Sequence, residues 1–267
     1  MTSTGARTPD LQDVIGEAVF LLSSPRRFLM EVAVSPVGHG VVDHSKALAD
    51  PITRFRNTSA YIFLIAFGED EERRRIISFV NRAHGPVRSE SYNAFDPRLQ
   101  LWIAAVMWQG GRDIYERFLG PLDEDAAEDL YQQFAVYGTS LQVPPELWPA
   151  DLAAFDEYWR NTLDNLVIDE KVRVFAHQLL SGGSAPWFVR AGMPLNRLIT
   201  VGLLPPEVRR TYGFEWNDRS QKAFDILIGI GAPIYRILPR SLRHLPKRLV
   251  LRDARKRLAS TDKRVAI

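Results

Sequence analysis

The stretch that indicates the fold class is residues 96–119, DPRLQLWIAAVMWQGGRDIYERFL. It begins with a helix start, because an aspartate side chain caps a helix and proline is tolerated at the first helical position. The residues that follow predict a long apolar helix over 98–119, without the alternation of a strand. A helix this apolar needs other helices around it to be buried.

The chain on either side of this helix has the same character. A second Asp-Pro pair at 50–51 predicts a helix that ends at Gly68, and the charged turn 69–72 predicts another that ends at Gly85-Pro86. Ser35-Pro36 breaks the chain ahead of them. We therefore predict an all-α fold made of a single multi-helix domain. Further helices are expected over the ranges 10–22, 123–137, 151–163, 169–180, 219–235 and 240–259.

The chain contains no cysteine. This excludes a disulfide scaffold, a thiolate nucleophile, an iron–sulfur cluster and a cysteine zinc site. No His-Glu-x-x-His motif, Gly-x-Ser-x-Gly elbow or Walker loop is present, and Gly229-Ile230-Gly231 lacks the third glycine of a dinucleotide site. Most common enzyme classes are therefore disfavoured. The remaining candidate ligands for a transition metal are the histidines His39, His44, His84, His177 and His244.

Charge divides the chain unevenly. Eleven Lys/Arg and two Asp lie between residues 236 and 264, which gives this tail about +9, whereas the whole chain carries +2. The rest of the chain is therefore acidic. We expect a disordered N-terminus over 1–9, a helical domain over 10–236 and a basic amphipathic helix over 237–267.

The basic tail has an apolar stripe of leucines at helical spacing. We expect these leucines to pack on the protein's own domain and leave the arginines in solvent; contact with an anionic membrane surface is the alternative. Nucleic acid is not expected as a partner, because no aromatic residue lies among the basic ones after Tyr235. The stripe consists of Leu238, Leu242, Leu245 and Leu249.

The sequence predicts a cytoplasmic protein, with peripheral membrane association as an open alternative. Its first ten residues, MTSTGARTPD, lack the apolar core of a secretory signal. The longest apolar stretches, 61–67 and 224–235, are shorter than the roughly 20 residues that span a bilayer. We expect both stretches to form buried helices.

A polar stripe lies on the predicted helix 51–68. Arg54, Asn57, Thr58 and Tyr61 are spaced i, i+3, i+4 and i+7, so they share one face that leads into buried apolar turns. A buried charge requires a partner. Arg54 is then either a structural arginine that caps a neighbouring helix or part of a functional site.

His84 continues an apolar stripe on the next predicted helix, after Ile77 and Val80. It is either a hydrogen-bonded core residue or a neutral imidazole of the kind that a haem iron requires. Because the two helices are joined by a tight turn, we expect them to pack as an antiparallel pair. Arg54 and Thr58 would then lie beside or opposite His84.

Together with other short motifs along the chain, these residues resemble the MpaB-like oxygenase family, whose catalytic domain is shared with the latex-clearing rubber oxygenases. The resemblance covers roughly residues 10 to 255, and its strength lies in the order and spacing of many short motifs. These are Gly40–Ser45, Asp50-Pro51, Arg54–Thr58, Phe67-Gly68, Asn81–Val87, Tyr92–Pro97, Leu101-Trp102, Gly202–Pro206, Arg209–Gly213 and Leu238–Arg243.

The resemblance implies a distantly globin-like fold, haem b and dioxygen-dependent cleavage of isoprenoid carbon–carbon double bonds. By position, His84 resembles the proximal iron ligand, and Arg54 and Thr58 resemble the distal residues of the rubber oxygenases. Asn57 stands where those enzymes carry a lysine that can occupy the distal iron position. Asp43, beside His44, is the nearest candidate for their catalytic base; a hydrogen-bonded pair at a helix end is the alternative.

Two positions depart from the family pattern. Many relatives have histidine where this chain has Ser35 and Ala104. We predict a haem b oxygenase that acts with dioxygen on a hydrophobic, isoprenoid-like or lipid-like small molecule. The alternative is a non-catalytic helical member of the family that binds a lipid or a membrane surface.

Overall fold

The computed structural model describes residues 8–45, 47–182 and 187–265. Within these residues the chain is helical, without strand or sheet apart from one isolated bridge between Arg88 and Asn93, so the predicted all-α fold is confirmed. The globin-like relation stays a prediction, and most of the N-terminus expected to be disordered (1–7) lies outside the described residues. The helices are α1 (Leu11–Gly16), α2 (Ala18–Leu22), α3 (Ser24–Ala33), α4 (Ser35–His44), α5 (Pro51–Phe67), α6 (Asp70–His84), α7 (Pro97–Leu119), α8 (Glu124–Phe134), α9 (Val136–Thr139), η1 (Pro145–Leu147), α10 (Leu152–Asp164), α11 (Glu170–Ser181), α12 (Trp187–Leu203), α13 (Pro206–Thr211), α14 (Asp218–Ile237), α15 (Arg240–Arg243) and α16 (Leu245–Val265).

The predicted helix starts are confirmed at α5, α6 and α7. The Asp50 carboxylate accepts a hydrogen bond from the Thr53 amide at 3.1 Å, and Asp96 accepts one from the Arg98 amide at 2.8 Å. At α6, the Glu72 carboxylate accepts from the Glu69 amide at 3.0 Å. Each carboxylate satisfies an amide that would otherwise have no partner in the first turn of its helix.

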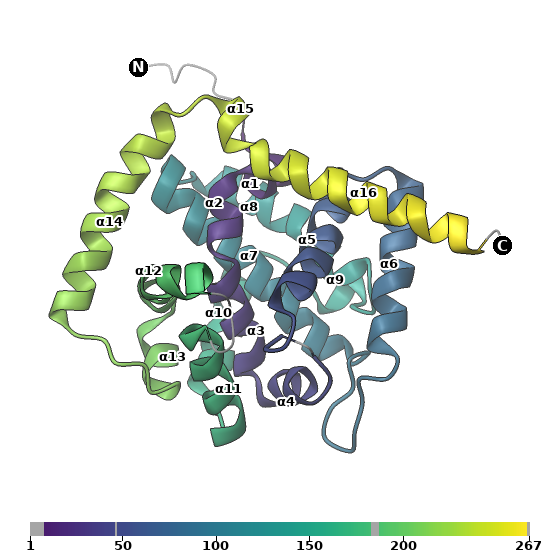
Figure 1. Cartoon of the computed structure of the whole chain (residues 1–267), viewed down its shortest axis with the longest axis horizontal. Helices are drawn as coiled ribbons and strands as arrows, with labels where there is room; N and C mark the ends of the chain where they lie inside the picture. The colour runs from purple at the N-terminus through teal and green to yellow at the C-terminus, as the bar shows by residue number, and fades with distance from the viewer. Residues whose placement is uncertain (1–7, 46, 183–186, 266–267) are drawn as a thin grey trace.

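Helix α7 lies among the other helices and forms the centre of the core (Figure 1). Trp102 and Trp108 are buried, and Trp108 meets the rings of Tyr131 and Phe134 edge-on, each at 5.4 Å between centroids. Helices α2, α3, α8, α9 and α14 all pack against α7. The apolar helix that begins after Asp96 is therefore buried by other helices, as its composition predicts.

Several expected boundaries are wrong. The helix expected over 10–22 is interrupted at Glu17, whose ψ of 137° is extended, and the helix expected over 240–259 is interrupted at His244 and continues to Val265. Ser35-Pro36 does end one helix, but the segment after it is itself helical as α4. Helices α3, α12 and α13 have no counterpart in the sequence analysis.

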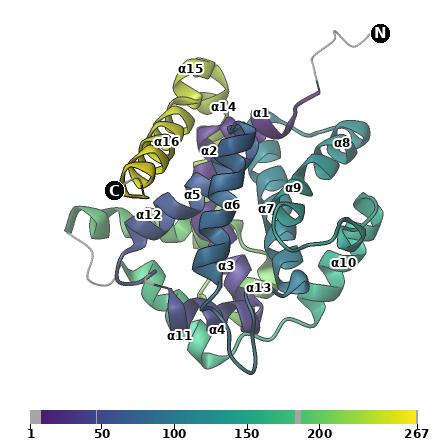
Figure 2. The same cartoon turned by 90° about the vertical axis from the view of Figure 1, so that its right-hand side faces the viewer.

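The C-terminal helices run along the outside of the domain. Figures 1 and 2 show α14, α15 and α16 following one another around its edge, and α16 packs on α5. Ala254 of α16 is buried, and Arg255 forms an ion pair with Glu72 at 2.7 Å. The tail therefore packs on the body, but through a different face from the one expected.

Two expectations about burial are wrong. The leucine stripe of the tail was expected to face the core, yet Leu242 and Leu249 are more than half exposed. The stretch 224–235 was expected to be buried, yet Ile226, Ile230 and Ile234 are also more than half exposed. In both helices smaller or aromatic residues on the opposite face make the contact with the body.

Candidate active site

Helices α5 and α6 bring Arg54 and His84 together. The two helices pack on each other and are joined only by Gly68 and Glu69. Arg54 lies in the first turns of α5, and His84 is the last residue of α6. They are close enough for the guanidinium of Arg54 to lower the pKa of His84.

The imidazole of His84 is neutral and incompletely hydrogen-bonded. Burial is the main cause that lowers its pKa, and the charge of Arg54 adds to this. Its ring meets Phe95 edge-on at 6.4 Å between centroids. Among the described residues, its buried Nδ1 atom has no hydrogen-bond partner. A core histidine normally has such a partner, so this ring has unused capacity to bind.

Arg54 has an apolar and an acidic neighbour on α3. Its guanidinium lies over the ring of Phe28 at 4.5 Å from the centroid. Burial lowers the pKa of Arg54, and the opposite charge of Glu31 raises it. In the part of the chain that the structure describes, no hydrogen bond or ion pair joins the two side chains, so the guanidinium is near a carboxylate without being held by it.

Glu31 is a site residue that the sequence analysis missed. Burial raises the pKa of this carboxyl to about 7, against the opposing effects of Arg54 and Arg27. The signal in the sequence is a single acid within the apolar run Phe28–Val34. A lone carboxyl in such a run is expensive to bury in its charged form, which is the condition that shifts its pKa toward neutrality.

The rest of the predicted polar face is divided among other neighbours. The Asn57 amide oxygen accepts a hydrogen bond from Arg257 of α16 at 2.6 Å. The Tyr61 hydroxyl donates to the carbonyl oxygen of Tyr137 at 2.8 Å. Thr58 is exposed. Of the four residues on this face, Arg54 is the one whose charge lowers the pKa of His84.

Asp43 belongs to a separate polar cluster at the end of α4. One carboxylate oxygen lies 2.5 Å from the Lys171 ammonium, and the other accepts from the Tyr92 hydroxyl at 3.1 Å. His44 contacts the same hydroxyl at 3.0 Å. The bond with Lys171 is the main cause that lowers the pKa of Asp43, so this carboxylate is ionised at neutral pH.

The loop that follows His84 connects this cluster to the site. A Cβ atom added at Gly40 would lie 3.3 Å from Val87 and 3.4 Å from Tyr92. Glycine thus lets the loop after α6 pack closely on α4. The same loop carries Phe95, whose ring meets His84 edge-on.

The two positions that depart from the family pattern have structural roles here. The Ser35 hydroxyl donates to the Val167 carbonyl oxygen at 2.7 Å. Ala104 is buried where α7 meets α9, and a Cβ atom at Gly138 would lie 3.3 Å from the Cβ of Ala104. A histidine side chain at position 104 would not fit between helices this close.

These observations define an all-helical protein whose candidate site combines a neutral histidine, a partly buried arginine and a carboxyl group whose pKa is raised to about 7. The chain belongs to the family described as "ER-bound oxygenase mpaB/B'/Rubber oxygenase, catalytic domain", which it matches over residues 12–231. The family resemblance seen in the sequence is therefore confirmed.

Two mycobacterial relatives are similar to the chain over most of their length. They are named Uncharacterized protein Mb2261 of Mycobacterium bovis and Uncharacterized protein Rv2237 of Mycobacterium tuberculosis. Each is 39% identical over 221 residues, which is 79% of this chain and 87% of the relative. No solved structure matches the chain significantly.

Proposed function

We propose that the protein is a haem-dependent oxygenase that acts on a hydrophobic, isoprenoid-like or lipid-like small molecule. Membership of an oxygenase family supports the reaction class. The observation that carries the haem assignment is the buried Nδ1 atom of His84, which has no partner among the described residues and belongs to a ring beside Arg54.

The residues of the site fit a haem group. A haem iron takes a histidine, a thiolate or another side chain as its axial ligand, and this chain has no cysteine. A ligating imidazole must be neutral, and both burial and the charge of Arg54 keep His84 in that form. When bound, haem would supply the one-electron and dioxygen chemistry that side chains cannot perform.

Arg54, which is near His84, and Glu31, which is near Arg54, would supply charge and proton control at the site. The guanidinium stays protonated at any physiological pH and would stabilise negative charge on dioxygen as it is reduced. Glu31, with a pKa of about 7, can hold or release a proton near neutral pH. We assign the proton-transfer role to Glu31, with Asp43 as the alternative, because the bond from Lys171 holds Asp43 ionised.

The side chains around these groups favour an apolar substrate. Phe28 packs on Arg54 and Phe95 packs on His84. Other aromatic residues, such as Phe63 and Trp102, are enclosed in the core, and the Trp102 indole donates to the backbone carbonyl oxygen of Glu31 at 3.2 Å. In this proposal, the substrate would contact Phe28 and Phe95 and would bind mainly through apolar surface.

The test is the visible spectrum of the purified protein after haem reconstitution. We expect a Soret band in the wild type and in His177→Ala, and its loss in His84→Ala. His177 is a matched control because its ring is occupied by a contact with the Tyr212 carbonyl oxygen at 2.9 Å. Circular dichroism verifies that both variants fold. A wild-type protein that stays colourless after reconstitution, or a His84→Ala variant with an unchanged band, contradicts the proposal.

A further inference from the structure

An apolar ridge lies on the outer side of the C-terminal helices. Its side chains are between 37% and 81% exposed, and they follow one another at helical spacing through α14, α15 and the start of α16. Scattered exposed apolar residues are common, but eight of them at helical spacing within residues 226–249 are typical of an interaction surface. The ridge consists of Ile226, Ile230, Ile234, Ile237, Leu238, Leu242, Leu245 and Leu249.

The ridge is not the side of these helices that packs on the body of the protein. Helix α14 already contacts the body through Phe224, Ala232 and Tyr235, which are buried on its opposite side. Helix α16 does the same through Ala254, with Val250 and Leu251 partly buried nearby. Each helix therefore has two apolar faces, and the body covers only one of them.

The cations of the tail form two groups. Those at the inner edge pair with acids of the body: Arg240 with Asp13, and Arg243 with Glu17 at 3.3 Å. Those on the outer face of α16 are exposed and, among the described residues, make no side-chain hydrogen bond or ion pair. The outer cations are Arg248, Arg252 and Lys256.

The charge along the ridge has a single sign. Residues 226–252 contain six Lys/Arg and no Asp or Glu. An anionic partner therefore meets no acidic residue from this segment. A second copy of the chain would bring like charges together, which is unfavourable.

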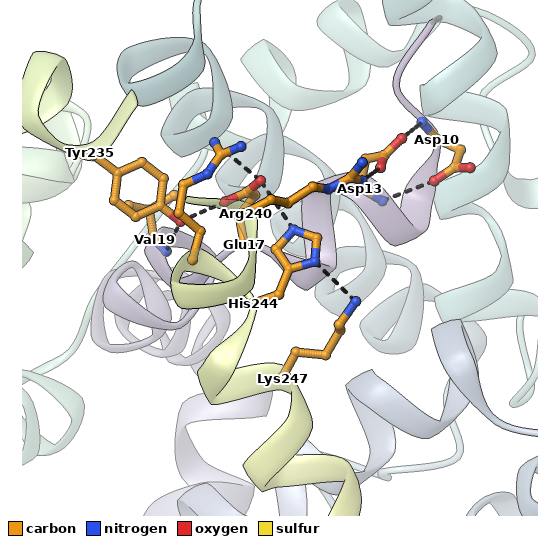
Figure 3. A network of polar contacts seen from close by, with 9 residues as sticks. Asp10, Asp13, Glu17, Val19, Tyr235, Arg240, His244 and Lys247 are labelled. Atoms are coloured by element: carbon orange, nitrogen blue, oxygen red, sulfur yellow. Dashed lines mark hydrogen bonds and ion pairs between the residues drawn. The ribbon is translucent and has the colours of Figure 1, made fainter. Parts of the chain in front are cut away.

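The corner between α14 and α16 is fixed on the body by buried polar contacts. Figure 3 shows Glu17 at the centre of these contacts, with the Tyr235 hydroxyl donating to it at 2.6 Å. His244 lies 3.3 Å from the other oxygen of Glu17, and the Lys247 ammonium lies 3.1 Å from the His244 Nδ1 atom. The apolar ridge is therefore held in place before any partner binds, which lowers the entropic cost of binding.

We propose that this ridge is the docking surface for an anionic lipid bilayer. The isoleucines and leucines would enter the boundary between headgroups and acyl chains, while Arg248, Arg252 and Lys256 would contact lipid phosphates. Among the described helices, none has the length and apolarity to cross a bilayer, so the contact is peripheral. This inference is independent of the proposed oxygenase activity.

The test is sedimentation of the full chain with vesicles. We expect binding to vesicles that contain phosphatidylserine, weaker binding to phosphatidylcholine alone, and a loss of the difference in 1 M salt, where the Debye length falls to about 3 Å. The charge variant Arg248→Gln/Arg252→Gln/Lys256→Gln should bind roughly a hundredfold more weakly, because each basic residue near an anionic surface contributes about 1 kcal/mol. Arg88→Gln/Arg98→Gln/Arg210→Gln removes the same number of exposed cations elsewhere and should bind like the wild type.

The apolar contribution is tested separately. Ile237→Ser/Leu242→Ser/Leu249→Ser should abolish binding, whereas Val167→Ser/Val174→Ser, which changes exposed apolar residues outside the ridge, should not. All these side chains are exposed, so the variants should keep the wild-type circular dichroism. Equal binding of the wild type and both ridge variants overturns the proposal. Dimerisation by light scattering that the serine variant abolishes, without vesicle binding, also overturns it and assigns the ridge to a second copy.

Discussion

Helices α7 and α14 are similar in apolar content but differ in what surrounds them. Around α7, neighbouring helices cover most of the surface, so Trp102 and Trp108 are buried. Helix α14 lies at the edge of the domain (Figure 1), and its residues Ile226, Ile230 and Ile234 are more than half exposed. The comparison shows that apolar composition predicts a helix here, but its burial depends on how many neighbours reach it.

The largest expected difference is in the cost of removing a side chain. Trp108→Ala should lower the free energy of unfolding by about 3–5 kcal/mol, because it leaves a cavity among packed rings. Ile230→Ala should change it by less than about 0.5 kcal/mol, because that side chain is already in solvent. Urea denaturation of both variants measures the two values. Equal losses would mean that α14 is covered as fully as α7.

A second difference concerns charge. Because the pKa of Glu31 is raised from 4.5 to about 7 in the folded protein, the folded state binds more protons than the unfolded state between these values. Stability should therefore fall as the pH rises from about 4.5 to 7.

Glu31→Gln should remove this loss of stability. Between pH 4 and pH 8, the free energy of unfolding of the variant should therefore rise by ~2–3 kcal/mol relative to that of the wild type. Arg252→Gln, an exposed change on α16, should leave the pH dependence unaltered. Thermal unfolding across this pH range is the measurement. If the melting temperatures of the wild type and Glu31→Gln changed in parallel with pH, the pKa of Glu31 would not be raised in the folded protein, which contradicts this prediction.

The smallest expected difference is at glycines. A Cβ atom at Gly110 of α7 would lie 2.6 Å from Arg27 Cγ and 2.8 Å from Arg26 Nη1, whereas one at Gly229 of α14 meets nothing within 4 Å. Gly110→Ala should lower the free energy of unfolding by about 1–2 kcal/mol, because the added methyl group overpacks the core. Gly229→Ala should stabilise by about 0.5–1 kcal/mol, because alanine is the better helix former. The melting temperatures should therefore move in opposite directions, and a shift of the same sign would contradict this account.

The parts of the fold that local chemistry determines could be predicted from the sequence. The Asp-Pro starts of α5 and α7 depend only on residues within one turn. Helix α3 could not be predicted, because its Arg26 and Arg27 look like surface residues. Their guanidinium groups are buried and bind the Leu203 and Phe20 carbonyl oxygens, contacts that no local pattern shows.

The same distinction applies to the candidate site. The placement of His84 near Arg54 follows from two consecutive helices joined by a short turn, so it could be predicted. The partner of Asn57 could not, because Arg257 lies 200 residues further along the chain. Helical spacing also identified the leucine stripe of the tail, but it could not show whether the leucines face the body or the solvent. Helix α16 has a second apolar face, and that face packs on the body instead.

The contact between Glu17 and His244 joins positions 227 residues apart in the chain. During synthesis, the N-terminal helices leave the ribosome long before the residues that neutralise Glu17 have been made. Until then this carboxylate lacks its partners and must stay hydrated, so the junction of α1 and α2 cannot reach its final packing. The final packing of this N-terminal junction therefore requires residues 235–244 to be present.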